Sequence, residues 1–596
     1  MLASCGHGTA ADTRINVGSS ALAARPGIVP VDIHQTGPLI VAVDGRVQWR
    51  TADLAMHAHQ HGSAATVAQA YRREAHDCLQ YMAGSFAVAV LDTQESSGLL
   101  AVDRMGIRPL CYANAGGQLV FGSTAQSVAA HPSVGAQLSD QAIFNYLYFH
   151  EVPSPRTIYR AVRKLQPGEC ALFRNGAVET RFYWGLRYAE RANASQRKLE
   201  LRFRRVLREA TGRTLGDDAD VGAFLSGGTD SSTVAGLLAE LRGRPPKTYS
   251  IGFAAEGFDE IEYARITARH FGADAHEYYV KPQDVVDTIP LVAQAYDEPF
   301  GNASAVPTYL CARMAREDGV RVMLAGDGGD EIFGGNARYA FQKLFELYGA
   351  IPGWLRGRLI EPVVFGLPHA ERLAPWRKLR SYIRQSRIPL PDRLESYNFL
   401  QRSPLAEILE LDFLARVDAN EPFALHREVY ERTASRSAVD RMMHLDLKFT
   451  LADNDLRKVV RMCEAAGVEA RFPFLDDELV QFSGEIPAGL KVKRLKLRYF
   501  FKQALKDFLP AETIAKTKHG FGMPFGLWLK EYKPLAELTR ESLGSLQRRG
   551  IVRPQYVAGL LRHHESSHAT YYGVMIWVLM MLEQWLAARG ISSAGR

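Results

Sequence analysis

Nine residues, FLSGGTDSS at positions 224–232, connect a strand-like segment to a helical one. The strand-like segment is DVGAFLS (220–226), and further ones occur at 247–253, 276–280 and 319–326. Helical patterns lie between them. After the first strand, apolar residues recur at the i, i+3, i+4 and i+7 spacing of one helix face: Val234, Leu237, Leu238 and Leu241. Strands that alternate with helices predict an α/β fold with a parallel sheet covered by helices.

A second helix in this region is expected to start at Asp259, with Glu262 at the capping-box position, and to end near Gly272. The first 190 residues differ, because they contain short segments rich in branched and aromatic residues between turns: SFAVAVLD (85–92), GLLAVDRMG (98–106) and GQLVFGS (117–123). The hydrophilic stretch 187–198 has no apolar periodicity, and beyond about residue 375 the chain is mainly helical. We therefore expect a β-rich domain over 1–190 and an α/β domain with a helical C-terminal part over 198–596.

Composition excludes several classes of protein. With 596 residues, 47% hydrophobic and 23% charged, the chain is typical of a soluble protein of two or more domains. Its six cysteines include no CxxC pair, which indicates reduced thiols rather than disulfides or a zinc site. The start, MLASC, lacks the features of a signal peptide, and the apolar run 573–582 is too short to span a bilayer. We expect a cytoplasmic protein without membrane contact.

The glycine- and serine-rich loop is placed where a ligand can bind. In open parallel sheets, ligands bind beyond the carboxyl ends of the strands, and a helix N-terminus there favours an anion. Gly227 and Gly228 permit a close backbone approach, and Ser226, Ser231 and Ser232 add hydroxyl donors. A tight Gly-Gly turn before an N-capped helix is the simpler alternative. A Walker A loop is excluded, because the lysine of GxxxxGK is missing.

Asp230 changes the interpretation of this loop. A carboxylate there would repel a phosphate unless a cation lay between them, which suggests bound Mg²⁺. A second acidic turn, LAGDGGDEIFGG (324–335), follows the last of the four strands and contains Asp327, Asp330 and Glu331. A solvated acidic turn would explain this second motif taken alone. The two motifs together, at successive strand ends, predict a nucleotide site with a metal ion.

Four motifs occur in a characteristic order: SGGTDSS, GDGGDE, GVEARFPFLD (467–476) and KHGFGMPFGLW (518–528). In this order, from about residue 200 to 530, the chain resembles the synthetase domain of the asparagine synthetases. The resemblance implies an ATP-pyrophosphatase fold, similar to the adenine nucleotide α-hydrolases, that activates a carboxylate as its acyl-adenylate for attack by an amine. It implies that the loop 226–232 binds the pyrophosphate of ATP and that Asp230 and Asp330 bind Mg²⁺.

The same resemblance implies roles for further residues. Leu225, Ile251, Ala325 and Gly326 would line the adenylate. Asp327 stands where the family has an acid that takes protons from the incoming amine. Lys518 matches the lysine that neutralises charge on the reacting phosphate.

The N-terminal part resembles the family's glutaminase domain, which has the N-terminal-nucleophile (Ntn-hydrolase) fold, but its chemistry departs from that domain. Position 2 is Leu, and Cys5 could act only after removal of four residues. The Asn-Gly that forms the family's oxyanion hole is Asp44-Gly45 here, and an acid there would repel an oxyanion. The segment that binds the glutamine amine is GSAAT (62–66), without its acid. We interpret this glutamine amidotransferase-like domain as degenerate. The sequence Asp-Gly-Arg is more similar to that of beta-lactam synthetases and lasso-peptide cyclases.

The leading hypothesis is therefore an ATP-dependent, AMP-forming amide ligase of asparagine synthetase type, with a small-molecule or peptide carboxylate and with ammonia or a substrate amine. Alternatives are a glutamine-hydrolysing asparagine synthetase with Cys5 exposed by processing, and a catalytically silent scaffold. The basic run KVKRLKLRYFFK (491–502) is interpreted as a solvated amphipathic helix, so no nucleic acid is expected. The identity of the carboxylate and the formation of a homodimer stay open.

Overall fold

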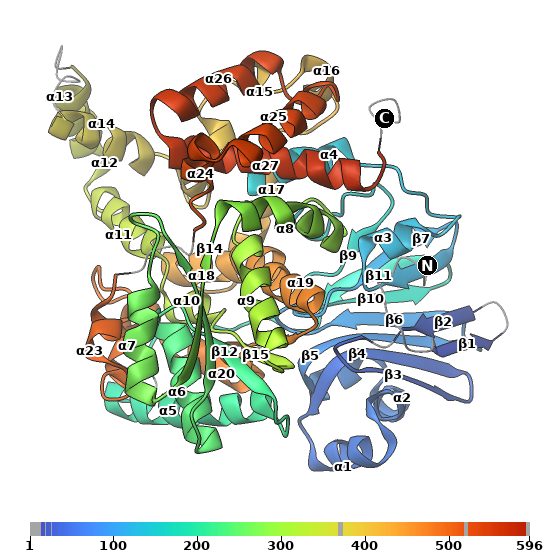
Figure 1. Ribbon diagram of the computed structural model, residues 1–596. Helices are drawn as coiled ribbons and strands as arrows, with labels where there is room; N and C mark the ends of the chain where they lie inside the picture. Colours follow the sequence, from blue (N-terminus) through green and yellow to red (C-terminus); the bar gives the residue numbers. More distant parts are fainter. Residues whose placement is uncertain are drawn as a thin grey trace.

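The computed structural model describes residues 13–17, 20–25, 27–192, 194–366, 374–517 and 522–591. Figure 1 shows a β-rich N-terminal part at the lower right and an α/β part at the lower left, with helices above them. The first described residues form a hairpin of β1 (Thr13–Val17) and β2 (Ser20–Ala24).

The main N-terminal sheet has six antiparallel strands in the order β11-β10-β6-β5-β4-β3. A smaller sheet has the order β8-β7-β9. Helices α1 (Ala52–His61) and α2 (Ser63–Glu74) cover one face of the main sheet. The strands are β3 (Val31–Thr36), β4 (Leu39–Trp49), β5 (Met82–Asp92), β6 (Ser97–Val102), β7 (Cys111–Ala115), β8 (Gln118–Gly122), β9 (Arg163–Lys164), β10 (Glu169–Arg174) and β11 (Ala177–Phe182).

The alternation of side chains along β5 explains these layers. Val88 and Val90 belong to the apolar cluster that includes the residues of α1 and α2, whereas Ala87 and Ala89 pack with Tyr112 of the smaller sheet. The strand expected over 98–106 ends at Val102, because the next residues turn around the buried Asp103. The β-rich character of this part is confirmed.

The second sheet is parallel throughout, in the order β14-β13-β12-β15-β16. Four strands correspond to the predicted segments: β12 (Val221–Phe224), β13 (Lys247–Phe253), β14 (Asp274–Val280) and β15 (Val322–Leu324). Helices α5 (Gln196–Leu215), α6 (Thr229–Arg242) and α7 (Ile261–Phe271) share one apolar cluster with the sheet, and α9 (Ala305–Glu317) and α19 (Leu456–Ala466) share another. The predicted parallel α/β architecture is confirmed.

Two details of this domain differ from the sequence expectations. The fifth strand, β16 (Glu469–Arg471), was not predicted, because three residues with two charges carry no strand pattern. Helix α7 does end at Gly272, whose φ of +61° is left-handed, but the capping box is wrong. The helix begins after Glu260 without a side-chain cap, and Glu262 instead pairs with Arg269 at 2.9 Å.

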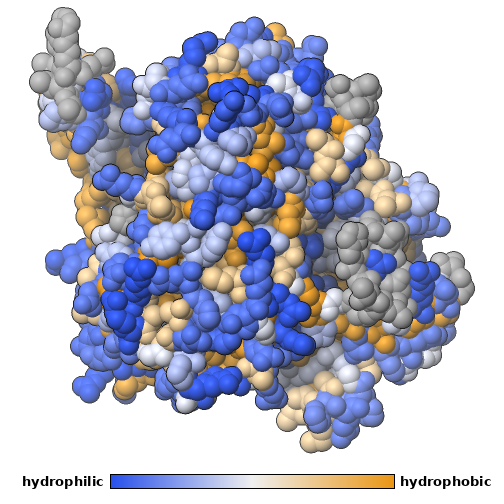
Figure 2. Space-filling view, in the orientation of Figure 1, coloured by the Kyte–Doolittle hydropathy of each residue, from blue (hydrophilic) through white to orange (hydrophobic). Residues whose placement is uncertain are grey.

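Helices α24 (Phe525–Glu531), α25 (Lys533–Gln547), α26 (Pro554–Ser566) and α27 (Ala569–Ala588) form the top of the molecule in Figure 1. The apolar run 573–582 lies inside α27, which is longer than the run. By length and composition α27 could cross a membrane, but 67% of its most apolar window is buried within the protein. It packs against α8 (Pro282–Ala295), and we interpret it as a core helix. The exterior in Figure 2 is mainly hydrophilic, with interspersed apolar patches.

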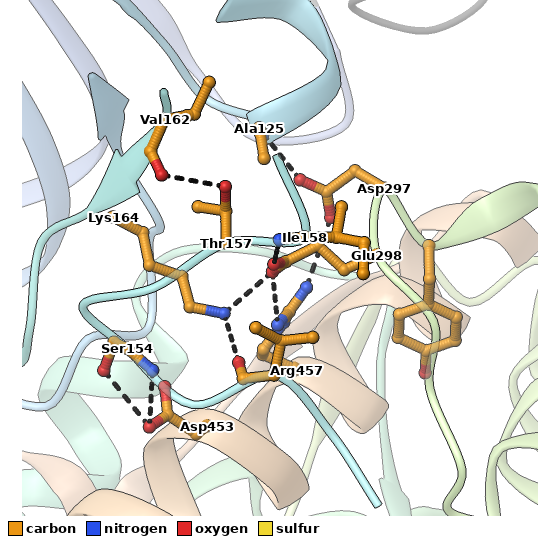
Figure 3. Close-up of polar contacts among 12 residues, drawn as sticks. Ala125, Ser154, Thr157, Ile158, Val162, Lys164, Asp297, Glu298, Asp453 and Arg457 are labelled. Carbon is orange, nitrogen blue, oxygen red and sulfur yellow. Dashed lines mark hydrogen bonds and ion pairs between the residues drawn. The ribbon is translucent and has the colours of Figure 1, made fainter. Parts of the chain in front are cut away.

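The N-terminal part is joined to the α/β part by a buried ionic network, shown in Figure 3. The Lys164 ammonium, on β9, lies 2.7 Å from the Glu298 carboxylate. Arg457 of α19 donates to Glu298 at 2.9 Å and to Asp297 at 3.2 Å. Asp297 in turn accepts the Ala125 amide at 2.7 Å. The buried charges are thus paired and hydrogen-bonded, which buried charges require.

Candidate functional site

The loop after β12 is tightly built. Gly227 has a φ of +69°, and a Cβ there would lie 2.4 Å from the backbone carbon of Tyr263, so only glycine fits against α7. The hydroxyls of Ser226 and Ser231 are 3.0 Å apart, and the Ser226 amide donates to the Ser231 hydroxyl at 3.2 Å. Gly228 is the N-cap of α6, so the first amides of this helix open onto the loop.

The acidic loop after β15 packs directly on this first loop. A Cβ on Gly326 would lie 2.8 Å from the Ser231 amide nitrogen, and one on Gly329 would lie 2.4 Å from the Asp230 carboxylate. The Ala325 amide donates to the Arg471 carbonyl of β16 at 2.9 Å. The structure therefore brings the two predicted motifs together at the carboxyl edge of the parallel sheet.

A single guanidinium connects the two acids that were expected to bind a metal ion. Nη1 of Arg498 lies 2.7 Å from Oδ1 of Asp230, and Nη2 lies 2.5 Å from Oδ1 of Asp330. Arg498 also donates to the second Asp230 oxygen and to the Thr229 hydroxyl. Its side chain is only 7% exposed. Burial lowers the pKa of Arg498, but Asp230 and Asp330 outweigh this effect and raise it above its usual range.

This geometry fits a divalent cation. The Arg498 guanidinium contacts both carboxylates, so a divalent cation in its place can also contact both. In nucleotide sites, Mg²⁺ commonly binds one or two carboxylates together with phosphate oxygens. Among the residues that the structure describes, no group of three or more acidic, histidine or cysteine side chains is arranged for a metal ion. A metal here would thus depend on the nucleotide for further ligands.

A pocket lies beside the first loop. It is lined by Leu225, Ser226, Ser250, Ile251, Phe258, Glu260, Ile261 and Ala264. Three of the predicted nucleotide residues, Leu225, Ser226 and Ile251, are among them, whereas Ala325 and Gly326 are not. The lining combines apolar side chains with a few polar groups, as ligand pockets do.

Sequence reasoning missed Lys516, which lies beside this pocket. The Lys516 ammonium lies 3.2 Å from the Glu260 carboxylate and 3.4 Å from the Ser226 carbonyl oxygen, and it stands over the Tyr263 ring. Lys516 is two residues before Lys518, which itself lies outside the described residues. No local pattern distinguishes Lys516 from a surface lysine, since its partners are far away in the sequence.

Asp327 lies in the acidic loop near a second charged pair. Burial raises the pKa of Asp327 to about 6, while Lys458 lowers it and Asp455 raises it. The Lys458 ammonium is 2.6 Å from the Asp455 carboxylate. A carboxyl group that titrates near neutral pH can accept a proton from an incoming amine.

Ser232 and the basic run are placed differently from the remaining site residues. The Ser232 hydroxyl is fully buried and lies 2.9 Å from the Thr267 hydroxyl, so it contacts α7 instead of the loop. The prediction of a solvated helix over 491–502 is wrong, because the chain is not helical between the end of α21 (Ala488–Lys491) and the start of α22 (Tyr499–Leu505), and both Lys491 and Arg498 are buried. The buried acids of the loops require a cation, and Arg498 supplies it.

The positions that depart from glutaminases have other partners in this structure. Arg108 donates to both oxygens of Asp44, at 2.8 and 2.9 Å, and Arg46 pairs with Glu469. The segment GSAAT begins α2, where the Ala64 amide donates to Asp32 at 2.8 Å. Cys5 lies outside the described residues. The other five cysteines are buried and unpaired, and burial raises the pKa of each thiol.

Comparisons with known proteins agree with this arrangement. The family model described as "Asparagine synthase" matches residues 202–587, and the "Glutamine amidotransferase domain" model matches 47–184. The chain is 26% identical to asparagine synthetase [glutamine-hydrolyzing] 1 of Bacillus subtilis, over 86% of this chain and 79% of that protein. It is 29% identical to a putative asparagine synthetase of Mycobacterium tuberculosis, over 88% and 80%. A fungal relative, the amidase chyE of Penicillium rubens, is 25% identical over 76% and 71%. Since the first family model covers more than half of its residues, the chain belongs to the asparagine synthase family.

Proposed function

We propose that this protein is an ATP-dependent, AMP-forming ligase that joins a carboxylate to ammonia or to a substrate amine. The family consists of carbon–nitrogen ligases and uses ATP. The proposal depends on the contact between the two loops. Through this contact Asp230 and Asp330 bind the same Arg498 guanidinium, beside the pocket that Leu225 and Ile251 line. This arrangement suits ATP with its adenosine in the pocket and its pyrophosphate group next to Asp230 and Asp330.

Residues of the chain supply the steps of this reaction. The backbone amides of Gly227 to Ser231 and the hydroxyl of Ser226 would bind the pyrophosphate. Leu225 and Ile251 of the pocket, with Ala325 and Gly326 of the acidic loop, would hold the adenylate. Asp230 and Asp330 would bind Mg²⁺, which neutralises pyrophosphate charge when bound. We assign to Lys518 the same electrostatic role. The buried Ser232 supports the helix instead of the ligand.

The atoms balance over two steps. A substrate carboxylate oxygen attacks the α-phosphorus, and the bond to the β-phosphate oxygen breaks, so pyrophosphate leaves with its charge neutralised. The amine nitrogen then attacks the acyl carbon, Asp327 takes a proton from it, and AMP leaves. Both steps need charge stabilisation at the loops, where backbone amides and cations are preorganised.

The first test is the identity of the nucleotide products. With a turned-over carboxylate and amine, ATP should yield AMP and pyrophosphate, detected by chromatography of the quenched reaction. The reason is that the loop has Asp230 at its centre and no Walker lysine. Formation of ADP and orthophosphate would contradict the proposal. Screening carboxylates for pyrophosphate exchange into ATP would at the same time identify the substrate.

The pH dependence tests the role of Asp327. Its pKa is raised to about 6, so amide formation should fall as the pH drops through 6, because the protonated carboxyl cannot accept the amine proton. Lys458→Met should move this acidic limb to higher pH, since Lys458 lowers the pKa of Asp327. Exchange of pyrophosphate, which precedes the amine step, should keep its own profile. An unshifted limb in Lys458→Met would exclude Asp327 as the titrating base.

A second candidate function is glutamine-dependent asparagine synthesis, because the bacterial relatives named above are called glutamine-hydrolyzing. We predict that this protein does not release glutamate from glutamine. The Asp44 carboxylate is held by Arg108, at a position where glutaminases need a neutral donor, and loss of one oxyanion donor costs about 100- to 1,000-fold. Glutamate production that disappears in Cys5→Ala, from a mature chain starting at Cys5, would restore this second function.

The remaining assignments complete the proposal. We propose domains over 1–190 and 198–596, with the boundary in the hydrophilic stretch 187–198, which includes the start of α5 at Gln196. A cytoplasmic location is proposed because this is where ATP is abundant. A homodimer is compatible with this proposal.

A further inference from the structure

Asp44 and Arg46 lie on β4 on either side of Gly45, and the proposed reaction gives them no role. Gly45 has a φ of +118°, and a Cβ there would lie 2.3 Å from the Ser85 carbonyl oxygen. Residues two apart on a strand share one side of it, so the charged side chains of Asp44 and Arg46 can face the same neighbour. Arg46 contacts the α/β domain directly, whereas Asp44 is connected to it through Arg108.

Arg46 makes a two-pronged ion pair with the edge strand of the parallel sheet. Its Nε and Nη2 atoms donate to the two Glu469 oxygens at 2.8 and 2.9 Å. Arg471 binds the same two oxygens at 2.9 Å each, so Glu469 lies between two guanidinium groups. The Glu469 side chain is 7% exposed and that of Arg46 is 41% exposed, so the glutamate is buried in the α/β domain while the arginine is partly open to solvent.

Asp44 connects to α19 through Arg108. Arg108 binds Asp44 with Nη2 and Glu464 with Nη1, the latter at 2.7 Å. The turn that carries Arg108 is fixed, because the buried Asp103 carboxylate accepts the amides of Met105, Ile107 and Arg108. This rigid turn of the N-terminal domain therefore holds α19 through the contact of Arg108 with Glu464.

Both connections end on elements that hold the acidic loop. Glu469 is the register partner of Val322 in β15, and the carbonyl of Arg471 accepts the Ala325 amide at the start of that loop. Helix α19 carries Lys458, which lowers the pKa of Asp327. A displacement of β16 or α19 would consequently move the groups around Asp327.

We infer that Asp44, Arg46 and Arg108 are positioning residues, which use Glu464 and Glu469 to hold β16 and α19 and thereby the loop 325–331 in its working geometry. These five residues are called the ionic junction. The N-terminal domain thus serves the synthetase site mechanically, through the positions that are altered from a glutaminase. The effect on turnover rests on the proposed function, whereas the effect on loop order does not.

The test uses the full-length chain with Arg46→Ala, Arg46→Lys and a matched control. Arg46 suits this purpose, because it is partly exposed and its removal leaves Glu469 paired with Arg471. The control is Arg73→Ala, which breaks an exposed pair with Asp53 at 3.7 Å in the same domain. Backbone amide hydrogen exchange over 322–331 and kcat for amide formation are measured for each variant. Asp44→Asn tests the second connection in the same way.

Arg46→Ala should speed hydrogen exchange in 322–331 and lower kcat by roughly 10- to 100-fold, the effect of a small misplacement of reacting groups. Arg46→Lys should recover part of both, because an ammonium can contact Glu469 but cannot make the two-pronged pair, and Arg73→Ala should match the wild type. Unchanged loop exchange and unchanged kcat in Arg46→Ala and Asp44→Asn, with only a lower Tm, would overturn the inference. If the wild type makes no AMP, the proposed function fails, while the comparison of hydrogen exchange still decides on the junction.

Discussion

Asp230→Asn and Asp330→Asn are each expected to lower the rate of ATP-dependent amide formation by about 100- to 1,000-fold, the range for removing one preorganised group that stabilises developing charge. Each change removes one negative charge from the place where a single cation contacts both carboxylates. The cation that neutralises the leaving pyrophosphate would then be bound weakly or in the wrong place. The loss should be partly recovered at high Mg²⁺ concentration.

The measurement is steady-state formation of AMP over a series of Mg²⁺ concentrations. Asp287→Asn is a suitable control, because Asp287 is an exposed acid on α8 that contacts Gln283. Circular dichroism should show that both site variants are folded, since Asp230 and Asp330 lie in the first turns of α6 and of the short helix Gly329–Phe333 and Asn keeps the shape of each side chain. Turnover close to that of the wild type in both variants would mean that the acidic loop does not take part in nucleotide chemistry.

The sequence was sufficient for the parts of the fold that have local patterns. Alternating strands and helices predicted the parallel sheet, and the position of SGGTDSS after β12 predicted a loop at its carboxyl edge. The contact between the two motifs also follows from these patterns, because carboxyl ends of neighbouring parallel strands meet at one edge. Helix starts were less predictable, as the unused capping box at Asp259 shows.

The residues that sequence reasoning missed all depend on distant partners. Arg498 lies 268 positions from Asp230, and Lys516 lies 290 positions from Ser226. Neither has a local signature, since an arginine in a basic run is usually solvated. Strand β16 was missed for a similar reason, because its charged residues are compatible with a strand only where Arg46 and Arg471 pair with Glu469. Burial of charge is decided by tertiary contacts.

The altered N-terminal domain illustrates how much a substitution alone can tell. From the sequence, Asp44 indicated only that the chemistry of an oxyanion hole is lost. The structure adds that Arg46 contacts Glu469 of the α/β part directly, whereas Asp44 binds Arg108, which in turn contacts Glu464. In the proposed function the N-terminal domain has no reaction of its own, and these contacts would give it a role at the neighbouring site.

Arg498→Met is expected to destabilise the protein by about 3–5 kcal/mol in the absence of Mg²⁺, the cost of removing one partner from a buried ion pair. The side chains of Arg498, Asp230 and Asp330 are 7%, 18% and 15% exposed, so water compensates little for the lost guanidinium. The two carboxylates would then face each other without this cation. Mg²⁺ can take its place, so the free energy of unfolding should recover as Mg²⁺ is added, by the linkage of binding to folding.

Arg549→Met is the matched control, because Arg549 pairs with Glu583 at 2.8 Å, the two side chains are 7% and 6% exposed, and both belong to the C-terminal helical region. Urea unfolding with and without Mg²⁺ should show a similar loss for the two variants without metal, and a recovery only for Arg498→Met. This readout needs no substrate and no turnover. Equal responses of the two variants to Mg²⁺ would show that Asp230 and Asp330 do not form a cation site, and the pairing with Arg498 would then be purely structural.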